Sequence, residues 1–380
     1  ITRKCCELMK ILLSKPYMSE KAIKSAVSVM RSGWLAHGKK VTEFESLFAE
    51  YTGVKRAVSL NSCTSALQLV IQALGITGEV IVPSFTFVAS ANSIVTAGAK
   101  PVFCDIDFDT CNMSIGSLES LITKNTEAIM PVHFAGQTCK MDAIMKIAKK
   151  HGLAVIEDSA ETIGGTFKGK KAGAFGIGCF SFFPTKNMTT AEGGMVTTND
   201  TALADKISRI RAHGIKRTPG NPAWKREAFY AGYNYRLNNV LAALGVEHIK
   251  ILDRLNDKRR ALASAYNKAL KNVPGLSFPK EDRGCTHVYQ MYTVKLLDRA
   301  IYWDSVVNAL NASGIEASVH FDPPVHLQSY YRKKCYLPSP LPVTEKVSGS
   351  IITLPMHPSL SFRDITLVSK KLAAILEKRN

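Results

Sequence analysis

The sequence predicts an α/β protein with a mostly parallel central sheet, followed by a smaller α+β domain at the C-terminal end. Between residues 55 and 198, short apolar runs rich in β-branched residues alternate with helix-like segments. This alternation is typical of strands that are buried on both faces and connected by helices. The chain has 380 residues, of which 46% are hydrophobic, and a chain of this length is usually divided between two packed domains.

The elements of the large domain follow from this alternation in chain order. The predicted strands are Ala57–Leu60, Glu79–Pro83, Lys100–Asp105, Ala128–His133, Ala154–Glu157, Cys179–Phe183 and Gly194–Thr198. The predicted helices among them are Thr64–Leu74, Phe87–Ala97 and Met141–His151. Around Asn239–Ala261, apolar residues recur at spacings of three and four, which predicts one long helix that connects the two domains.

The C-terminal part mixes both kinds of element. Strands are predicted at Pro274–Phe278, His287–Lys295 and Ser318–Phe321, and helices at Trp303–Ser313 and Phe362–Glu377. We therefore divide the chain into an N-terminal extension over residues 1–14, a large domain over residues 15–250 and a small domain over residues 251–380. The longest predicted loop, residues 217–229, is rich in Pro and Gly, and such loops are often functional or mobile.

The chain is strongly basic, with 49 Lys and Arg against 31 Asp and Glu and a net charge of +18. The basic residues are spread thinly and are not interleaved with stacking aromatic residues, so no nucleic-acid interface is expected. A solvated surface and steering of a phosphorylated substrate both remain open as reasons for the excess. The apolar runs are far shorter than the roughly 20 residues that cross a bilayer, so no membrane insertion is predicted.

The nine cysteines are scattered, with no CxxC pair and no metal-ligand spacing, so no metal site is predicted. We expect most of them to be buried free thiols in a reducing compartment. The first residues contain only a short apolar run interrupted by charge, which makes a poor signal peptide. The sequence therefore predicts a cytoplasmic location.

Lys186 follows an apolar strand in the segment Cys179–Asn187. An amine at the end of a buried strand can be desolvated, and desolvation favours the neutral, nucleophilic form that builds a Schiff base with a carbonyl compound. An exposed loop lysine is the alternative interpretation of this residue alone.

Two further polar positions follow strands of the same predicted sheet. Asp158 comes directly after Ala154–Glu157, at the carboxyl edge where open α/β sheets bind ligands. A carboxylate there can pair with the protonated pyridine nitrogen of pyridoxal 5′-phosphate (PLP), although a helix N-cap is the alternative. The small polar residues of Leu60–Leu67 lead from a strand into a helix, a junction that can seat a phosphate or simply cap the helix.

These motifs, in this order, resemble the DegT/DnrJ-type sugar aminotransferase family, and the resemblance covers nearly the whole chain from about Ser14 on. The segments that carry it are Ser32–Leu35, Asn61–Leu67, Pro83–Ala89, Glu157–Glu161, Phe180–Asn187, Gly232–Leu237 and Val319–His326. Each motif is weak by itself, but their joint occurrence in family order is very specific. The resemblance implies the PLP-dependent transferase fold of the aspartate aminotransferase type, known as fold type I.

The resemblance also implies roles for individual residues. Lys186 would hold PLP as a Schiff base and serve as the acid/base, Asp158 would face the pyridine nitrogen, and Glu161, where relatives often carry Gln, would lie beside the phenolic oxygen. The remaining cofactor-binding residues would be Cys63, through its backbone N–H, with Thr64 and Ser181 at the phosphate, Phe87 stacked on the ring, and Asn234 reaching the phosphate of the neighbouring subunit in a homodimer. His326 and His320 resemble substrate-side positions.

The activity implied by the resemblance is transfer of an amino group from L-glutamate to a keto-deoxysugar attached to a nucleotide diphosphate. The product would be an amino sugar for polysaccharide biosynthesis, such as lipopolysaccharide O-antigen. Related sugar dehydratases place His where Lys186 stands, which argues against dehydration. Two alternatives remain open: an aminotransferase for a cyclitol or aminobenzoate precursor, and a catalytically inert sensory homologue.

Overall fold

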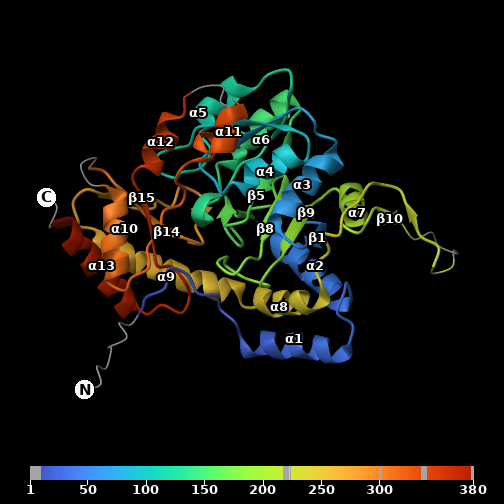
Figure 1. The fold of residues 1–380 in the computed structure, drawn as a ribbon, viewed down its shortest axis with the longest axis horizontal. Coiled ribbons are helices and arrows are strands. Elements are labelled where there is room, and N and C mark those ends of the chain that lie inside the picture. The colour runs from blue at the N-terminus through green and yellow to red at the C-terminus, as the bar shows by residue number, and fades with distance from the viewer. Residues whose placement is uncertain (1–9, 217–221, 223, 299–301, 335–339, 378–380) are drawn as a thin grey trace.

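The computed structural model describes residues 10–216, 222, 224–298, 302–334 and 340–377. Its centre is a seven-stranded sheet in the order β1-β9-β8-β5-β4-β2-β3, with helices packed around it (Figure 1). The strands are β1 Arg56–Leu60, β2 Glu79–Pro83, β3 Lys100–Cys104, β4 Thr126–Ile129, β5 Ala154–Asp158, β8 Ile177–Ser181 and β9 Gly194–Thr198. All seven predicted strands are present, with ends that differ by a few residues. The α/β fold class is confirmed.

The sheet is parallel except at β9, which pairs antiparallel with both β1 and β8. The chain therefore leaves the carboxyl end of β8, makes a loop and returns at once through β9. This short return places the loop of residues 182–193, which carries Lys186, at the carboxyl edge of the sheet. The β1 strand ends at the same edge as β9 begins, because Leu60 is paired with Gly194.

Helices cover both faces of the sheet because neighbouring strand residues point to opposite sides. Val80 and Val82 pack in one apolar cluster with α3 and α4, whereas Ile81 packs in another with α6. The helices of this part are α1 Glu20–Ser32, α2 Lys39–Thr52, α3 Cys63–Leu74, α4 Ala89–Thr96, α5 Ile115–Leu118, α6 Met141–His151, α7 Thr201–Ile210 and α8 Asn239–Ile249, with the short 3-10 helices η1 Glu119–Leu121 and η2 Phe134–Gly136.

The predicted long helix around Asn239–Ala261 is in fact two helices, α8 and α9 Leu252–Leu270. The break falls at Ile251, whose backbone (φ −119°, ψ 4°) is not helical. No Pro or Gly marks this position, so the apolar spacing alone could not show the break. Figure 1 shows α8 and α9 following one another along one side of the molecule, with α1 packed beside α8.

The C-terminal part has its own apolar cluster, built by α9, α10, α13 and a small antiparallel sheet. Its elements are β12 Leu276–Ser277, β13 Cys285–Thr286, β14 Tyr292–Leu296, α10 Trp303–Ala312, η3 Val325–Leu327, α11 Ser329–Lys334, α12 Pro342–Ser348, β15 Ile351–Leu354 and α13 Phe362–Glu377. Two predicted strands are corrected. The strand predicted at His287–Lys295 begins only at Tyr292, and Ser318–Phe321 forms only an isolated bridge from Ser318 to Thr353.

The end of the predicted N-terminal extension is part of the fold. Ile11 forms a parallel bridge with Ile315 and is buried in the C-terminal apolar cluster, and the carbonyl of Leu13 accepts a hydrogen bond from the N–H of Met356. Residues 11 and 13 are therefore held against the C-terminal part, which the sequence pattern did not indicate. The boundary drawn near residue 250 stays a prediction.

Four short strands form two further β pairs outside the central sheet. The small β pairs are β6 Thr166–Phe167 with β7 Lys170–Lys171, and β10 Ile215–Lys216 with β11 Glu227–Ala228. Strand β10 directly precedes the loop predicted over residues 217–229 and β11 lies within it, whereas residues 217–221 and 223 of that loop lie outside the described residues. The six described cysteines are free and buried, as predicted, whereas positions 5, 6 and 335 lie outside the described residues. Among the described residues, no helix is long and apolar enough to cross a membrane.

Candidate active site

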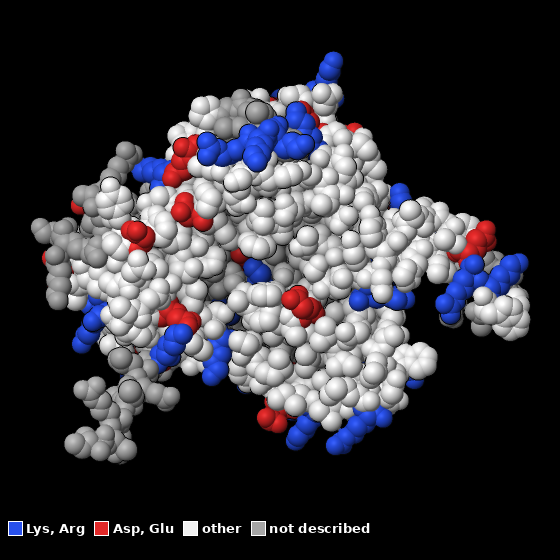
Figure 2. Space-filling view, in the orientation of Figure 1, with Lys and Arg blue, Asp and Glu red and all other residues white. Residues whose placement is uncertain are grey.

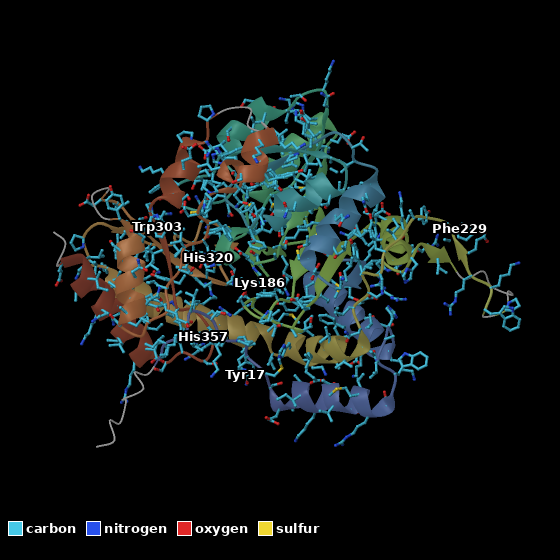
Figure 3. All side chains as sticks on the ribbon, viewed as in Figure 1. Tyr17, Lys186, Phe229, Trp303, His320 and His357 are labelled. Carbon is cyan, nitrogen blue, oxygen red and sulfur yellow. The ribbon has the colours of Figure 1, made fainter. Side chains whose placement is uncertain are left out.

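A pocket of about 540 Å³ lies where the carboxyl edge of the sheet meets the C-terminal part. Figure 2 shows it as a hollow near the middle of one face, with basic and acidic side chains inside, and Figure 3 shows Lys186 and His320 near the middle of the molecule in the same view. Most of the predicted site residues line it: Cys63, Thr64, Phe87, Asp158, Glu161, Ser181, Lys186 and His320. The fold thus brings together side chains that are up to 257 positions apart in the sequence, the separation of Cys63 and His320.

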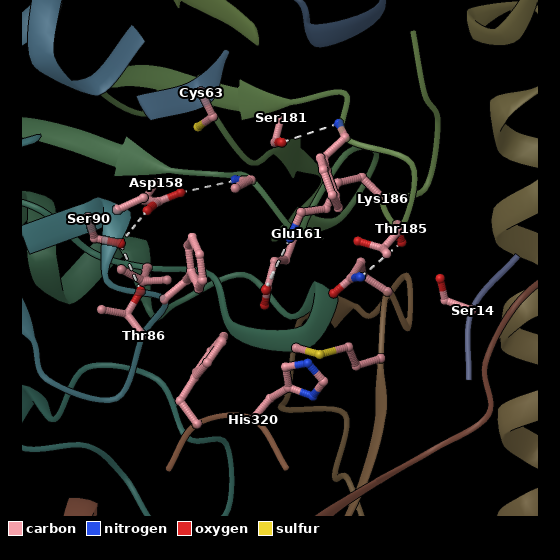
Figure 4. Close-up of a pocket in the computed structure, with 18 of the residues that line it drawn as sticks. Ser14, Cys63, Thr86, Ser90, Asp158, Glu161, Ser181, Thr185, Lys186 and His320 are labelled. Carbon is pink, nitrogen blue, oxygen red and sulfur yellow. Dashed lines mark hydrogen bonds and ion pairs between the residues drawn. The ribbon is translucent and has the colours of Figure 1, made fainter. Parts of the chain in front are cut away.

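Lys186 points into this pocket and meets Glu161 (Figure 4). Its Nζ lies 3.3 Å from Oε1 of Glu161, and both side chains are largely buried. The other carboxylate oxygen, Oε2, accepts a hydrogen bond of 2.9 Å from the N–H of Ala135. One oxygen of Glu161 is therefore fixed by a backbone hydrogen bond while the other faces Lys186. A buried lysine with one carboxylate partner is well placed to act as a nucleophile and as a proton carrier.

Asp158 lies at the opposite side of the pocket, at the end of β5. Its Oδ2 accepts a hydrogen bond of 2.7 Å from the hydroxyl of Ser90, and its Oδ1 accepts one of 3.2 Å from the N–H of Ala160. None of the ion pairs among the described residues includes it. Burial raises the pKa of the Asp158 carboxyl, and the Ser90 hydrogen bond only partly offsets this effect. A cationic ligand group at this position would be stabilised by a carboxylate that has no counter-ion of its own.

The N-terminus of α3 forms a third wall of the pocket. The Ser62 hydroxyl caps the helix by accepting a hydrogen bond of 3.1 Å from the N–H of Ser65. Cys63 and Thr64 are the first residues of the helix, and Ser181 ends the adjacent strand β8. Backbone N–H groups at a helix start favour an anion, and the hydroxyls of Thr64 and Ser181 are potential additional donors. Cys63 itself is a buried thiol whose pKa is raised by burial, so it is not a thiolate nucleophile.

Aromatic residues and His320 close the pocket on the side of the C-terminal part. Phe87 is exposed at the rim and lies 6.2 Å from Phe321, measured between ring centroids. The Nδ1 of His320 is 2.9 Å from the hydroxyl of Thr353. Burial lowers the pKa of His320, which favours the neutral imidazole near pH 7. His320 therefore lines the pocket as predicted, and its contact with a substrate stays a prediction.

Two predicted site residues lie outside the pocket of this chain. His326 is buried; its Nδ1 is 2.6 Å from the Ser84 hydroxyl and its Nε2 is 3.3 Å from Oε1 of Glu345. Both ring nitrogens of His326 thus contact protein groups in this chain, and its predicted substrate contact stays a prediction. Asn234 is exposed on the loop before α8, where its Oδ1 accepts a hydrogen bond of 3.1 Å from Nε of Arg236. Its predicted contact with a neighbouring subunit stays a prediction.

Other pocket residues were not found from the sequence. Ser14, Gln290 and Glu316 line the pocket. Gln290 donates a hydrogen bond of 3.0 Å to the carbonyl of Thr185, and its Oε1 is buried without a partner among the described residues. Glu316 accepts a hydrogen bond of 3.0 Å from the N–H of Leu13. The only available signal was for Ser14, which stands where the family resemblance begins.

The residues present fit PLP. The pocket offers an amine that can bind an aldehyde covalently, a buried carboxylate for a protonated ring nitrogen, and a helix N-terminus for a phosphate. The strongest observation is that Asp158 is buried, paired only with a hydroxyl and a backbone N–H, and exposed to the pocket. Such a carboxylate is expected where a cationic group of a ligand completes the pair.

Comparisons with known proteins agree with this geometry. The chain is 38% identical over 377 residues to the GDP-perosamine synthase of Caulobacter vibrioides, covering 97% of this chain and 99% of that relative. The structure of PseC from Helicobacter pylori, an aminotransferase of pseudaminic acid biosynthesis, has a TM-score of 0.93 at 30% identity and covers 97% of this chain and 100% of PseC. The PLP form of Spr1654 from Streptococcus pneumoniae has a TM-score of 0.91 at 27% identity, covering 98% and 100%.

The match to the family is as extensive as the match to these proteins. Residues 16–373 match the DegT/DnrJ/EryC1/StrS aminotransferase family. Because this range contains every element that builds the pocket except the Leu13–Ser14 rim, the fold, the cofactor and the enzyme class follow together. The chain belongs to the DegT/DnrJ/EryC1/StrS family and is a PLP-dependent aminotransferase.

Proposed function

We propose that this enzyme transfers the amino group of L-glutamate to a keto-deoxysugar attached to a nucleotide diphosphate, and so makes an amino sugar for a surface polysaccharide such as O-antigen. The observation that carries the proposal is the ion pair of Lys186 with Glu161 across the pocket from Asp158, whose carboxylate has no counter-ion among the described residues. The similarity to GDP-perosamine synthase supports a nucleotide-linked sugar as the acceptor. The free, buried thiols support the predicted cytoplasmic location.

Each residue then has a defined task. When bound, PLP supplies an electron sink for the carbon that gains or loses a proton. Lys186 binds the cofactor through Nζ and, once released, moves that proton. Asp158 keeps a positive charge on the pyridine nitrogen, and Glu161 orients Lys186 through the 3.3 Å contact between Oε1 and Nζ. Because Lys186 both binds the cofactor and moves the proton, the two halves of the reaction use the same residues in the same arrangement.

The charges in the pocket support a site that is completed by a second chain. Four carboxylates line the pocket, from Asp158, Glu161, Glu192 and Glu316, whereas Lys186 is the only Lys or Arg among the described lining residues. A phosphate and a nucleotide diphosphate need more positive partners than this. The exposed Asn234 and Arg236 lie outside the pocket of their own chain. We therefore propose a homodimer in which they face the partner's cofactor.

Mixing two inactive variants tests the shared site. We expect Lys186→Ala and Asn234→Asp to be poorly active alone, the latter because its carboxylate repels the phosphate. Co-expressed with two different affinity tags, they should regain about a quarter of wild-type activity, since about half of randomly paired dimers are mixed and each holds one intact site in two. Activity is measured on doubly purified heterodimers, where about half is expected.

The control is a heterodimer that carries both substitutions on one chain and none on the other. In that pairing each of the two sites collects one lesion, so activity should stay low. A Lys186→Ala and Asn234→Asp heterodimer that is no more active than this control, despite confirmed exchange of subunits, would show that Asn234 acts within its own chain.

A panel of acceptors tests the substrate class. UDP-, dTDP- and GDP-linked 3-keto and 4-keto sugars are incubated with the enzyme and ¹⁵N-glutamate, and the product is read by mass. We expect a labelled amino sugar with at least one nucleotide sugar and none with the free keto-sugar. Labelled product from a keto-cyclitol, with none from any nucleotide sugar, would overturn the proposal.

A further inference from the structure

The short 3-10 helix η2, Phe134–Gly136, contacts two groups that in turn contact Lys186 or its neighbour Thr185. It follows β4 and lies behind the pocket wall, next to both Glu161 and the segment of residues 288–291. Glu161 contacts the amine of Lys186, and Gln290, in the second segment, contacts the backbone of the preceding residue. The η2 turn therefore contacts both the residue that positions the side-chain amine of Lys186 and the segment that contacts the adjacent backbone.

The first contact runs through Glu161. The N–H of Ala135 donates to Oε2 of Glu161 at 2.9 Å, and Oε1 of Glu161 lies 3.3 Å from Nζ of Lys186. Ala135 has φ 54°, a left-handed conformation that is uncommon for a residue with a side chain. This conformation is maintained only if the surrounding contacts favour it over the ordinary alternatives. The direction of the N–H that fixes Glu161 therefore depends on what holds the turn.

The second contact runs through Gln290. The carbonyl of Gly136 accepts from the N–H of Val288 at 2.9 Å, and the side chain of Gln290 donates to the carbonyl of Thr185 at 3.0 Å. Gly136 has φ 106°, and a Cβ added there would approach the backbone nitrogens of Tyr289 and Gln290 within 2.8 and 2.9 Å. The turn and the segment with Gln290 are thus in direct contact, and a displacement of one moves the other.

Asn112 closes the turn from outside the pocket. Its Oδ1 accepts a hydrogen bond of 2.9 Å from the N–H of Phe134, and its Nδ2 donates one of 3.0 Å to the carbonyl of Gln137. One side chain therefore joins the residues at the two ends of the turn. Asn112 is only 5% exposed and does not line the pocket.

The backbone of Asn112 is itself fixed. The N–H of Asp107 donates to the Asn112 carbonyl at 2.8 Å, and the buried amine of Lys295 donates to the carbonyls of Phe108 and Asp109 at 2.6 and 3.1 Å. The loop that carries Asn112 is thereby tied to β14 in the C-terminal part. A rigid anchor is what a side chain needs if it is to hold another segment in an unusual conformation.

We propose that Asn112 is a positioning residue of the active site: by holding the η2 turn, it fixes Glu161 and Gln290 and, through them, both the amine and the backbone of Lys186. This proposal rests on the proposed role of Lys186. It assigns Asn112 no contact with the cofactor or with either substrate. Its effect is on the orientation and the electrostatic surroundings of the lysine.

The test compares Asn112→Ala and Asn112→Asp with the wild type. Asn112→Ala removes both hydrogen bonds, whereas Asn112→Asp keeps the acceptor for Phe134 and loses the donor to Gln137. In the apo protein, amide exchange at Ala135 is expected to be at least about tenfold faster in Asn112→Ala and intermediate in Asn112→Asp, because loss of a buried hydrogen bond lowers the free energy of local opening.

A spectroscopic signature of the PLP-bound protein gives the second measurement. The pH midpoint of the visible absorbance band of bound PLP should shift in both variants, because the carboxylate that faces Lys186 is no longer fixed. Other titratable groups that interact electrostatically with this cluster are Asp158, His320 and the Cys63 thiol. The shift should accompany a lower kcat with a nearly unchanged KM for the nucleotide sugar, since Asn112 does not touch the substrate.

Asn239 provides a matched control. It is also 5% exposed, its Oδ1 accepts from a backbone N–H, that of Lys40, at 2.9 Å, and its Nδ2 donates to a backbone carbonyl, that of Trp34, at 3.0 Å. Asn239→Ala should lower the melting temperature about as much as Asn112→Ala while leaving Ala135 exchange and the pH midpoint as in the wild type.

The outcomes are distinguishable. Wild-type exchange at Ala135 and a wild-type pH midpoint in Asn112→Ala would overturn the proposal, as would the same changes in Asn239→Ala. If Asn112→Ala does not fold, Asn112→Asp and Gly136→Ala, which displaces the Gln290 segment, take its place with the same expected shift of the midpoint. Borohydride trapping of PLP in the wild-type protein, followed by peptide mapping, tests the Lys186 anchor separately from the role of Asn112. Reduced cofactor attached to a residue other than Lys186 would reject the anchor itself.

Discussion

Replacing Lys186 by Ala should lower the rate of transamination by at least about 10⁴-fold, because the variant loses the covalent anchor and the proton carrier together. The fold should persist, since Lys186 is a pocket residue whose only described side-chain partner is Glu161. Some PLP should still bind without a covalent bond, because Asp158 and the α3 N-terminus are unchanged. The rate is measured by ¹⁵N transfer from glutamate, and cofactor binding by absorbance after gel filtration.

Lys171→Ala is the matched control for this prediction. Lys171 is likewise a partly buried lysine, whose amine donates to the carbonyl of Tyr51 at 2.7 Å, but it lies outside the pocket. Its loss should change stability more than the catalytic rate. If Lys186→Ala kept more than a few per cent of wild-type turnover, or if Lys171→Ala lost as much, Lys186 could not be the anchor.

The parts of the fold that the sequence predicted are those with a strong local pattern. Strands β2 and β9 were predicted with their exact ends because β-branched residues fill them and polar residues follow. Helix α6 was predicted for the same reason, with its apolar residues at helical spacing and Gly152 directly after it. The break at Ile251 has no such signal, because neither Pro nor Gly stands there and the apolar spacing continues across it.

The same distinction holds for the active site. That Lys186 and Asp158 lie in one pocket could be predicted because each follows a buried strand and strands of a parallel sheet end at the same edge, whereas their roles were implied by the family resemblance. Ser14, Gln290 and Glu316 could not, since their place in the pocket depends on how the C-terminal part folds back on the sheet. Asn112 is further removed, because its role follows only from hydrogen bonds to residues 22 and 25 positions away. For His326 a motif match predicts a substrate contact, and only the structure shows that its two ring nitrogens lie beside Ser84 and Glu345.

The second large effect is expected for Asp158→Asn, which should lower kcat by about 10²- to 10³-fold while PLP is retained, because a neutral amide does not stabilise a cationic ring nitrogen. The folding stability of the apo protein, in contrast, should be unchanged or higher in this variant at pH 7. Burial raises the pKa of Asp158 above its ordinary value of 3.8, so this group's contribution to folding stability falls as the pH rises above 3.8. At pH 7 the apo Asn variant should therefore melt at or above the wild-type temperature, and the difference should shrink as the pH is lowered towards 3.8.

Asp105→Asn separates this effect from the loss of any hydrogen-bonded carboxylate that follows a strand of the sheet. Asp105 also directly follows a strand of the sheet, β3, and its carboxylate accepts from the backbone N–H groups of Val343 and Thr344 at 3.0 and 2.7 Å, but it lies outside the pocket. Its Asn variant should melt at a lower temperature because an amide replaces an acceptor of several hydrogen bonds, and its kcat should stay within a few-fold of the wild type. Asp158→Asn with near-normal kcat and a lowered melting temperature would instead assign Asp158 the same structural task as Asp105, that of holding the chain after its strand.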